Sequence, residues 1–346
     1  MCQYLLTTET VRINLQYRYI FKIVKIEDPE QKKVKTKAVI MTGPGNLEIA
    51  DLELKKPEKG DVVVEIDYSG VSTGTEKLFW SGEMPAFPGM GYPLVPGYES
   101  TGEVVEVGPE SGLNIGDIVF APGANCFGNV KSLFGGAARY LVTPADRLIK
   151  IDQTMGPSGA LFALAATARH ALAGFDSKLP DLIVGNGVLG RLLARLTVAA
   201  GGEAPTIWEN NKARIQSTHE CQVIDPQDDE KTNYSAIYDA SGDAKILDSL
   251  VGRVKKGGEI VLAGFYPGSV SFMFAPAFIK EARFRIAAEF TTDDVIATRS
   301  LIESNALSLE GLISDIAPVS QALSAYEKAF NKLDCLKMVL DWRNAA

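Results

Sequence analysis

The sequence is poor in the residues from which protein zinc sites are built. It holds two histidines, His170 and His219, and four cysteines that lie far apart and form no Cys-x-x-Cys pair. A protein zinc site usually draws on several such residues, and disulfide scaffolds need cysteines in a closely spaced framework. The sequence therefore argues against a metal site and against a disulfide framework, and it favours a reducing, cytoplasmic setting.

Long apolar runs and excess positive charge are also lacking. No apolar stretch reaches about eighteen residues, so no transmembrane segment is expected. The formal net charge is −8, which argues against a nucleic-acid partner. Residues 1–36 carry neither the pattern of a secretory signal nor that of a transit peptide. We expect them to be an N-terminal extension of poor order.

The pattern of apolar residues divides the rest of the chain into two regions. From Lys37 to about residue 150, short strand-like runs alternate with turn signals, which predicts a β-rich, barrel-like domain. Residues 151–290 alternate strand-like and helix-like runs, which predicts a doubly wound parallel sheet. The expected fold class is α/β, and 346 residues suffice for two domains with separate cores.

A glycine-rich turn follows the apolar run Leu182–Val184. Gly185, Gly187 and Gly190 have the G-x-G-x-x-G spacing, and a helical pattern begins directly behind them. Such a turn brings the backbone close to a pyrophosphate, which the free N–H groups of the helix N-terminus then bind. Glu209 ends the next apolar run, where a carboxylate binds the adenosine ribose hydroxyls and repels a 2′-phosphate.

The expected cofactor is therefore NAD, while Arg214 nearby keeps NADP open as the alternative. The residues expected to bind the cofactor lie in the turn and at strand ends: Gly185, Asn186, Gly187, Val188, Leu189, Gly190, Glu209, Asn210, Ser241 and Gly264.

Several strings resemble the medium-chain dehydrogenase/reductase superfamily: Gly70–Glu76, Pro96–Gly102, the glycine turn and Tyr238–Gly242. The resemblance covers Lys37 to Trp342. It implies a GroES-like catalytic domain over 37–150 and 291–346, and a Rossmann dinucleotide-binding domain over 151–290. Dimers are common in the superfamily, so a homodimer is expected.

Longer strings resemble the branch of this superfamily that acts in bacteriochlorophyll biosynthesis: Ser72–Gly82, Met84–Ser100, Cys126–Gly128 and Phe134–Ala138. This resemblance implies an NAD-dependent dehydrogenase acting on a secondary alcohol. Its substrate would be a chlorophyllide-type tetrapyrrole, whose C3 1-hydroxyethyl group is oxidised to acetyl.

Zinc-dependent members of the superfamily carry a cysteine in the segment that matches 72–75, a histidine where Tyr98 stands, and a third ligand near Ala165 and Ala166. Hydroxyls, a phenol and alanine do not replace thiolate and imidazole around zinc, so the resemblance implies a zinc-independent enzyme. The expected catalytic residues are Ser72, Thr75, Tyr98 and Glu99. Thr75 matches the proton-relay hydroxyl of the family. In the alternative, Tyr98 only fills the vacated metal site and Glu99 only accepts hydrogen bonds from a nearby turn.

The segment Leu78–Tyr92 is rich in aromatic residues, methionine and proline. Large apolar faces suit a flat macrocycle, so Trp80, Phe87 and Met90 are expected to contact substrate, as is His170 on a helix near the cleft. In the alternative, these residues plug the β-rich domain and His170 packs or hydrogen-bonds, while His219 is a surface residue. Lys77 and Arg139 are candidates to pair with a propionate, or else solvated charges.

Two further functions remain open at this point. One is a zinc-free, NADPH-dependent quinone or enone reductase, which needs no proton-relay residue. The other is a non-enzymatic, dinucleotide-regulated carrier that binds a tetrapyrrole without hydride transfer.

Overall fold

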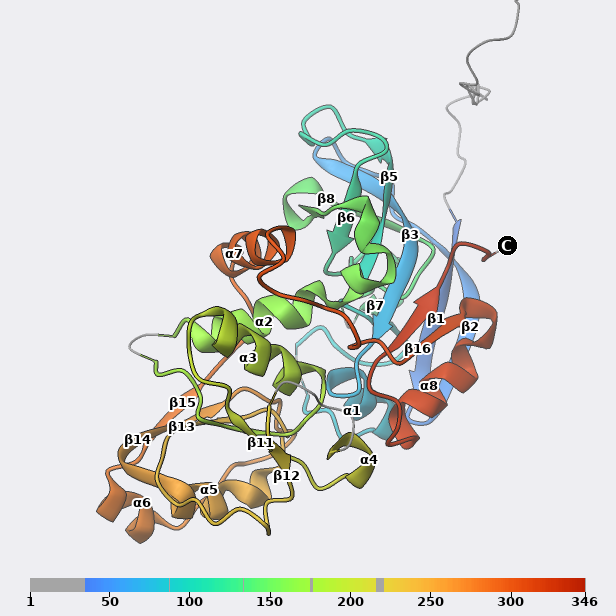
Figure 1. The fold of residues 1–346 in the computed structure, drawn as a ribbon. Coiled ribbons are helices and arrows are strands. Elements are labelled where there is room, and N and C mark those ends of the chain that lie inside the picture. The colour runs from blue at the N-terminus through green and yellow to red at the C-terminus, as the bar shows by residue number, and fades with distance from the viewer. Residues whose placement is uncertain (1–34, 87, 133, 175–176, 216–220, 346) are drawn as a thin grey trace, which may run out of the picture. The chain divides into compact units, whose positions relative to one another are not determined.

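The computed structural model describes residues 35–345 except 87, 133, 175–176 and 216–220 (Figure 1). The predicted extension over 1–36 lies almost wholly outside these residues, as do Phe87 and His219. Among the helices within the described ranges, none is long and apolar enough to cross a membrane.

The first region builds two sheets from strands with apolar, buried inner faces. One has the order β2-β1-β4-β7, and the other has the order β16-β17-β3-β5-β6-β9 with β8 paired to β3. The strands are β1 Lys35–Gly43, β2 Asn46–Glu53, β3 Asp61–Val71, β4 Leu94–Val95, β5 Ser100–Val107, β6 Ile118–Ala121, β7 Lys131–Ser132, β8 Tyr140–Pro144, β9 Ile149–Lys150, β16 Asp315–Pro318 and β17 Met338–Asp341.

Two helices belong to this region, α1 Thr75–Ser81 and α8 Ala322–Asn331. Helix α8 follows the helical period, because Ala322, Ala325, Tyr326, Ala329 and Phe330 are its buried residues. Strand β2 and helix α1 were not anticipated from the sequence. Their local patterns are weak, and pairing with β1 or packing under the sheet supplies the stability that the pattern does not signal.

The second region is a six-stranded sheet in the order β12-β11-β10-β13-β14-β15, and every neighbouring pair is parallel. Its strands are β10 Leu182–Val184, β11 Thr206–Trp208, β12 Val223–Ile224, β13 Tyr234–Asp239, β14 Val254–Leu262 and β15 Arg283–Ile286. Helices α2 Phe162–Leu172 and α3 Val188–Ala199 cover one face, and α5 Leu247–Arg253 and α6 Phe274–Lys280 cover the other (Figure 1). The doubly wound sheet predicted from the sequence is confirmed.

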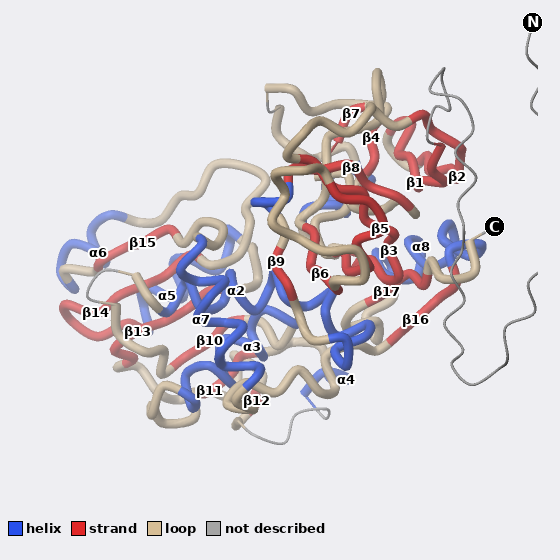
Figure 2. The backbone as a smooth tube through the Cα atoms, turned by 90° about the horizontal axis from the view of Figure 1, so that it is seen from above, coloured by secondary structure: helices blue, strands red, loops and turns tan. Residues whose placement is uncertain are grey.

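The strand order reverses between β10 and β13, which is where open α/β sheets bind ligands. The short helix α4 Lys212–Ile215 follows β11. Helix α7 Thr292–Glu303 packs against α2, and Leu307, Leu309 and Leu312 join the core cluster of α2 and α3. The chain rejoins the first region at β16, and the two groups of strands stand apart in Figure 2. The domain limits expected from the sequence stay predictions.

Candidate active site

The glycine turn connects β10 to α3 in a conformation that two of its glycines require. Gly185 has φ +97°, a region that L side chains rarely adopt. A Cβ on Gly190 would lie 1.9 Å from the carbonyl oxygen of Gly185, so only glycine fits there. Nothing lies within 4 Å of a Cβ built on Gly187, the N-cap of α3, so this side of the turn is open. The turn therefore offers bare backbone and a helix N-terminus, which suits a pyrophosphate.

Glu209 reaches back from the end of β11 to this turn. Its Oε2 accepts a hydrogen bond from the Asn186 amide at 3.1 Å, and its Oε1 accepts one from the Asn211 amide at 2.8 Å. Asn210 beside it is exposed. Arg214 donates to the carbonyl oxygens of Leu333 and Cys335, at 3.2 and 3.5 Å. The carboxylate thus lies beside the turn, as a ribose-binding acid must, while Arg214 is directed to the segment ahead of β17.

The ends of β13 and β14 border the same crevice. A Cβ on Gly185 would lie 3.3 Å from the Ser241 amide nitrogen, so the turn and this strand end are in contact. Ser241 donates through its amide and its hydroxyl to Oδ1 of the buried Asp239. The amide of Gly264 donates to the Asp239 carbonyl oxygen at 2.8 Å. The structure therefore brings Ser241 and Gly264 to one edge of the sheet with the glycine turn. Val188 is buried in the first turn of α3 and Leu189 is half-buried.

Ser72 and Tyr98 form a hydroxyl pair in the first region. The Ser72 Oγ and the Tyr98 hydroxyl are 2.8 Å apart, and the Thr75 amide donates to Ser72 Oγ at 3.3 Å. Burial, and then the Glu99 carboxylate, raise the pKa of Tyr98 above its ordinary value, although hydrogen bonds from Ser72 and Thr75 oppose the shift. The phenol is therefore protonated at neutral pH and acts as a hydrogen-bonding hydroxyl rather than as a phenolate base.

Ser72, Tyr98 and Ala166, which the resemblance places where metal-dependent relatives carry zinc ligands, lie close together here, but they carry the wrong chemistry for that metal. The half-buried Tyr98 ring packs against the apolar cluster that includes Ala166 of α2, and it contacts Phe134 edge-on. Alanine makes room for the phenol ring. The set therefore offers a serine hydroxyl, a phenol and a methyl group where zinc requires nitrogen or sulfur donors, so zinc does not fit it.

Glu99 is held by a lysine from the far end of the chain. Both side chains are buried, and Lys337 Nζ donates to Glu99 Oε2 and, at 3.1 Å, to the Val71 carbonyl oxygen. A Cβ on Gly70 would lie 2.7 Å from Glu99 Oε2, so the pair also requires this glycine. Burial raises the pKa of Glu99, and the Lys337 ammonium opposes that shift. The donor to Glu99 is thus a distant lysine rather than the nearby turn considered from the sequence.

A second buried carboxyl group, Glu76, anchors the loop that carries Ser72. Its Oε1 accepts a hydrogen bond from the Ser72 amide at 3.1 Å, and the Tyr326 hydroxyl of α8 lies against it. Burial, and then the charge of Glu99, raise the pKa of Glu76 to about 8. A protonated Glu76 beside the Glu99–Lys337 ion pair leaves this buried cluster without net charge at neutral pH.

His170 and Asp294 form a third polar group, between α2 and α7. His170 Nδ1 lies 2.7 Å from Asp294 Oδ2, and Arg169 pairs with the other carboxylate oxygen. Thr291 adds two donors in the capping box of α7. Burial alone would raise the pKa of Asp294, but the donors from Thr291, Arg169 and His170 lower it to about 2. The carboxylate is therefore ionised, and the imidazole is fixed in orientation.

The aromatic segment between α1 and β4 rests on the β-rich core. Trp80 is half-buried, with its ring 5.5 Å from that of Phe330, and Met90 packs against the same core. These contacts account for part of each side chain, so the structural and the substrate-binding interpretations both remain. Lys77 is exposed, whereas Arg139 pairs with Glu65 and donates to the Ile66 carbonyl oxygen.

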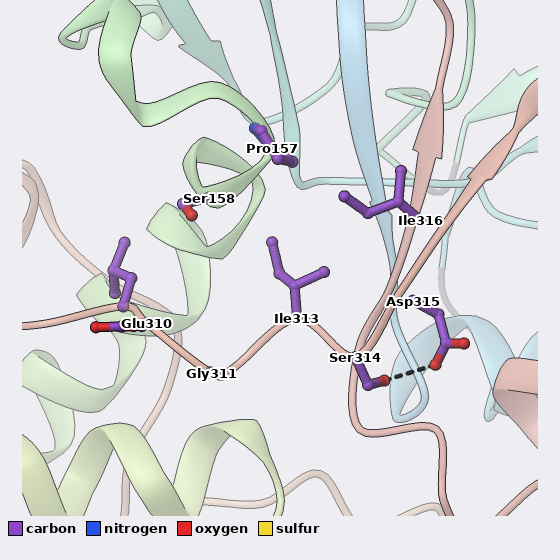
Figure 3. Close-up of a pocket in the computed structure, with 9 residues that line it drawn as sticks. Pro157, Ser158, Glu310, Gly311, Ile313, Ser314, Asp315 and Ile316 are labelled. Carbon is purple, nitrogen blue, oxygen red and sulfur yellow. Dashed lines mark hydrogen bonds between the residues drawn. The ribbon is translucent and has the colours of Figure 1, made fainter.

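A hollow of about 340 Å³ lies elsewhere, between residues 157–158 and the segment 309–316 (Figure 3). Pro157, Ser158, Glu310, Ile313 and Asp315 are among its lining residues. It contains none of the residues of the hydroxyl pair, the glycine turn or the His170–Asp294 pair, so we do not assign the chemistry to it.

Sequence reasoning missed four residues of these clusters: Glu76, Lys337, Tyr326 and Asp294. Glu76 closes the string Gly70–Glu76, and Lys337 stands directly before the apolar closing strand. A charge at such a place is a signal, but Glu99 lies 238 residues from Lys337, and Tyr326 is similarly remote from Glu76, so neither partner can be identified from sequence. The capping box Thr291–Asp294 was the one local pattern available.

The chain resembles known proteins over most of its length. A family model described as the alcohol dehydrogenase GroES-like domain matches residues 58–153. A relative from Cereibacter sphaeroides, "2-desacetyl-2-hydroxyethyl bacteriochlorophyllide A dehydrogenase", is 59% identical over 318 residues, which cover 90% of this chain and 100% of the relative. Its counterpart of the same name from Rhodobacter capsulatus is 60% identical over 313 residues, with the same coverage of 90% and 100%.

Solved structures share the fold at low sequence identity. 2R,3R-butanediol dehydrogenase from Bacillus subtilis superposes with a TM-score of 0.77 at 20% identity, covering 89% of this chain and 100% of that one. A putative zinc-binding dehydrogenase from Sinorhizobium meliloti, bound to NADP, gives 0.75 at 19% identity, covering 90% and 100%.

Proposed function

Because the chain belongs to the medium-chain dehydrogenase/reductase superfamily and, within it, to the hydroxyethyl bacteriochlorophyllide dehydrogenases, we propose that it oxidises the hydroxyethyl group of a bacteriochlorophyllide precursor to acetyl. The observation that carries the proposal is the identity of 59–60% with two such dehydrogenases, along the whole length of both. The alcohol carbon loses a hydride to a nicotinamide dinucleotide, and the hydroxyl loses a proton to the protein.

We assign NAD as the hydride acceptor. Gly185, Gly187 and Gly190 give the bare turn that a pyrophosphate needs, and the Glu209 carboxylate stands beside it to accept hydrogen bonds from ribose hydroxyls. The same carboxylate repels the 2′-phosphate of NADP. Ser241 and Gly264 border the nicotinamide end of the crevice. When bound, the dinucleotide supplies the oxidising power, and the chain supplies its position.

The proton of the alcohol passes through hydroxyl groups. The Tyr98 phenol, which stays protonated, accepts a hydrogen bond from the substrate alcohol while it donates to Ser72 Oγ, 2.8 Å away. Half-buried Thr75 at the start of α1 completes this set and passes the proton to bulk water, which is its final acceptor. Glu99 does not take the proton and acts through its ion pair with Lys337. A positioned relay of this kind is typically worth about 10²–10⁴ in rate. Zinc takes no part in this chemistry, because serine, phenol and alanine side chains do not suit it.

A spectral assay tests the activity. Purified protein, NAD and a 3-hydroxyethyl bacteriochlorophyllide should give NADH together with a red shift of the long-wavelength pigment band. Tight pigment binding without NADH would assign the chain to the tetrapyrrole carriers. Reduction of quinones or enones with NADPH, without alcohol oxidation, would assign it to the reductases.

Two measurements test the chemistry assigned to the site. Tyr98→Phe removes the relay hydroxyl but keeps the ring packed against α2, so kcat should fall about a hundredfold or more while NAD affinity stays constant. Full turnover with an unchanged pH profile would leave Tyr98 a space-filling role. Metal analysis of the same active sample should find no stoichiometric zinc.

We also propose that the chain forms a homodimer through the edge strand β15 and helix α6. Large apolar residues are exposed there over one short stretch, including Phe274 at 73% and Ile286 at 77%. A strand at the edge of a sheet pairs readily with a second copy of itself, and such a twofold contact closes after two chains.

Light scattering tests the dimer. The wild type should have twice the mass of one chain, and Ile286→Lys should have the mass of one. Ile296→Lys changes an exposed isoleucine on α7 instead and should stay dimeric. If the wild type is monomeric and binds lipid vesicles, the exposed apolar surface of β15 and α6 contacts a membrane and not a second chain.

A further inference from the structure

The His170–Asp294 pair presents an imidazole nitrogen in a fixed orientation. Asp294 accepts hydrogen bonds from Thr291 and pairs with Arg169, so it is the acceptor in this cluster, and the proton of the 2.7 Å contact with its Oδ2 is on His170 Nδ1. In the neutral imidazole the lone pair is then on Nε2. The Asp294 side chain is 2% exposed, whereas that of His170 is 29% exposed, so the imidazole emerges from a buried support.

A carboxylate behind an imidazole is the usual support of a metal-ligating histidine. The outer hydrogen bond fixes the tautomer, sets the ring plane and raises the basicity of the other nitrogen. Arg169 and Thr291 hold Asp294 in place. Among the described residues no cluster of three histidine, cysteine or acidic side chains could hold a metal ion. One imidazole therefore suits a metal that brings most of its ligands with it.

The position of His170 relates it to the hydroxyl pair. It stands one turn after Ala166 on α2, and so on the same face of that helix. Ala166 belongs to the apolar cluster against which Tyr98 packs, and Val295, the neighbour of Asp294, belongs to it as well. One turn of helix, about 5.4 Å along its axis, separates Ala166 from His170, so the imidazole stands beside the cluster that contains Tyr98.

We propose that His170 Nε2 is the axial ligand of the central metal of the substrate macrocycle, with Asp294 as its positioning residue. Four pyrrole nitrogens hold a magnesium ion in the plane, which leaves an axial site for one further donor. The inference rests on the proposed function, because it requires a metallated tetrapyrrole. It makes the central metal a determinant of specificity, and it fixes the pigment so that its hydroxyethyl arm lies at Tyr98.

Paired substrates test this coordination. Steady-state kinetics are measured with a magnesium hydroxyethyl bacteriochlorophyllide and with the same pigment freed of its metal. The wild type should prefer the metallated pigment through a lower KM. His170→Ala should raise KM for the metallated pigment about 10–100-fold and erase this preference, with a much smaller change for the metal-free pigment. The pigment band that is sensitive to axial ligation should shift on binding to the wild type and not on binding to the variant.

Three further samples separate ligation from a general loss of structure. His170→Gly with added free imidazole should regain the preference for the metallated pigment. Asp294→Asn should weaken that preference about tenfold, because it unfixes the tautomer. Arg299→Ala, which breaks an exposed ion pair with Glu303 elsewhere on α7 and leaves the imidazole and Asp294 in place, should affect the two pigments equally.

Equal losses on both pigments in His170→Ala, or a wild type that does not distinguish them, would overturn the axial ligation while the dehydrogenase activity stands. If neither pigment yields NADH with the wild type, the proposed function itself fails.

Discussion

The two regions of this chain build their binding geometry in different ways. At the dinucleotide turn, backbone atoms of neighbouring residues make the site, and glycine is required because any Cβ at Gly190 meets the Gly185 carbonyl. In the β-rich region, side chains from residues 72, 76, 98, 99 and 337 meet in a buried polar cluster. A backbone site tolerates few residue types but needs only a short segment. A side-chain cluster depends on the whole fold, and its parts can be exchanged only together.

The sharpest test of the cluster is to remove its ammonium group. Lys337→Met leaves Glu99 buried without its counter-ion, so the free energy of unfolding should fall by about 3–5 kcal/mol. The double variant Glu99→Leu/Lys337→Met removes both charges and should recover most of that loss. Urea unfolding of the wild type, Lys337→Met, Glu99→Leu and the double variant measures the coupling energy. If the losses of the two single variants simply add in the double variant, the two residues are not coupled.

Glu76 makes the stability of the β-rich region depend on pH. Its folded pKa is raised from 4.5 to about 8, so the stabilisation is full below about pH 4.5 and is lost as pH rises toward 8. Glu76→Gln stays neutral and still accepts from the Ser72 amide. It should match the wild type near pH 4.5 and exceed it by a few kcal/mol at pH 8, at about 1.4 kcal/mol per pKa unit. Denaturant midpoints of the wild type and Glu76→Gln are compared between pH 4.5 and 9. If the two midpoints changed with pH in parallel, Glu76 would not be the source of the pH dependence.

One added methyl group should disrupt the glycine turn. Gly190→Ala forces the turn away from α3, so the fold should lose about 1–3 kcal/mol and NADH binding should be lost. Gly187→Ala is the matched control, because it has open space and an ordinary φ of −77°. This variant should be as stable as the wild type and should lower only the affinity for the cofactor. Calorimetry measures the loss of stability, and NADH fluorescence measures the loss of cofactor affinity. If the two variants lost the same stability, the close contact at Gly190 would not be what requires glycine there.

The smallest expected effect concerns the choice of dinucleotide. Glu209→Ala removes the ribose-binding carboxylate and its repulsion of a 2′-phosphate. NAD affinity should fall about tenfold, which is about 1.4 kcal/mol, and NADP affinity should rise. Fluorescence titration with both reduced cofactors gives the ratio. Asn210→Ala, which changes the exposed neighbouring residue, should alter the ratio of the two affinities little. An unchanged ratio in Glu209→Ala would show that this carboxylate does not set the preference for NAD.

The predictions from sequence succeeded where the signal was local. The parallel sheet followed from alternating runs, and the turn followed from three glycines between a strand and a helix. The local pattern does not mark where a strand ends: β3 runs from Asp61 to Val71, and β15 runs only from Arg283 to Ile286. Pairing with neighbouring strands, which the run itself does not encode, decides where a strand ends.

By itself, the sequence determined that a glycine turn stands on a parallel sheet, because residue type and spacing suffice for it. That hydroxyls replace the metal ligands stays a prediction from the resemblance. Only the tertiary structure decided that Lys337 neutralises Glu99, that Glu76 holds the Ser72 loop and that Asp294 orients His170. The Lys337–Glu99 and Asp294–His170 contacts join residues far apart in the sequence, which only folding brings together. Glu76 reaches the nearby Ser72 amide because α1 is packed against the β-rich core.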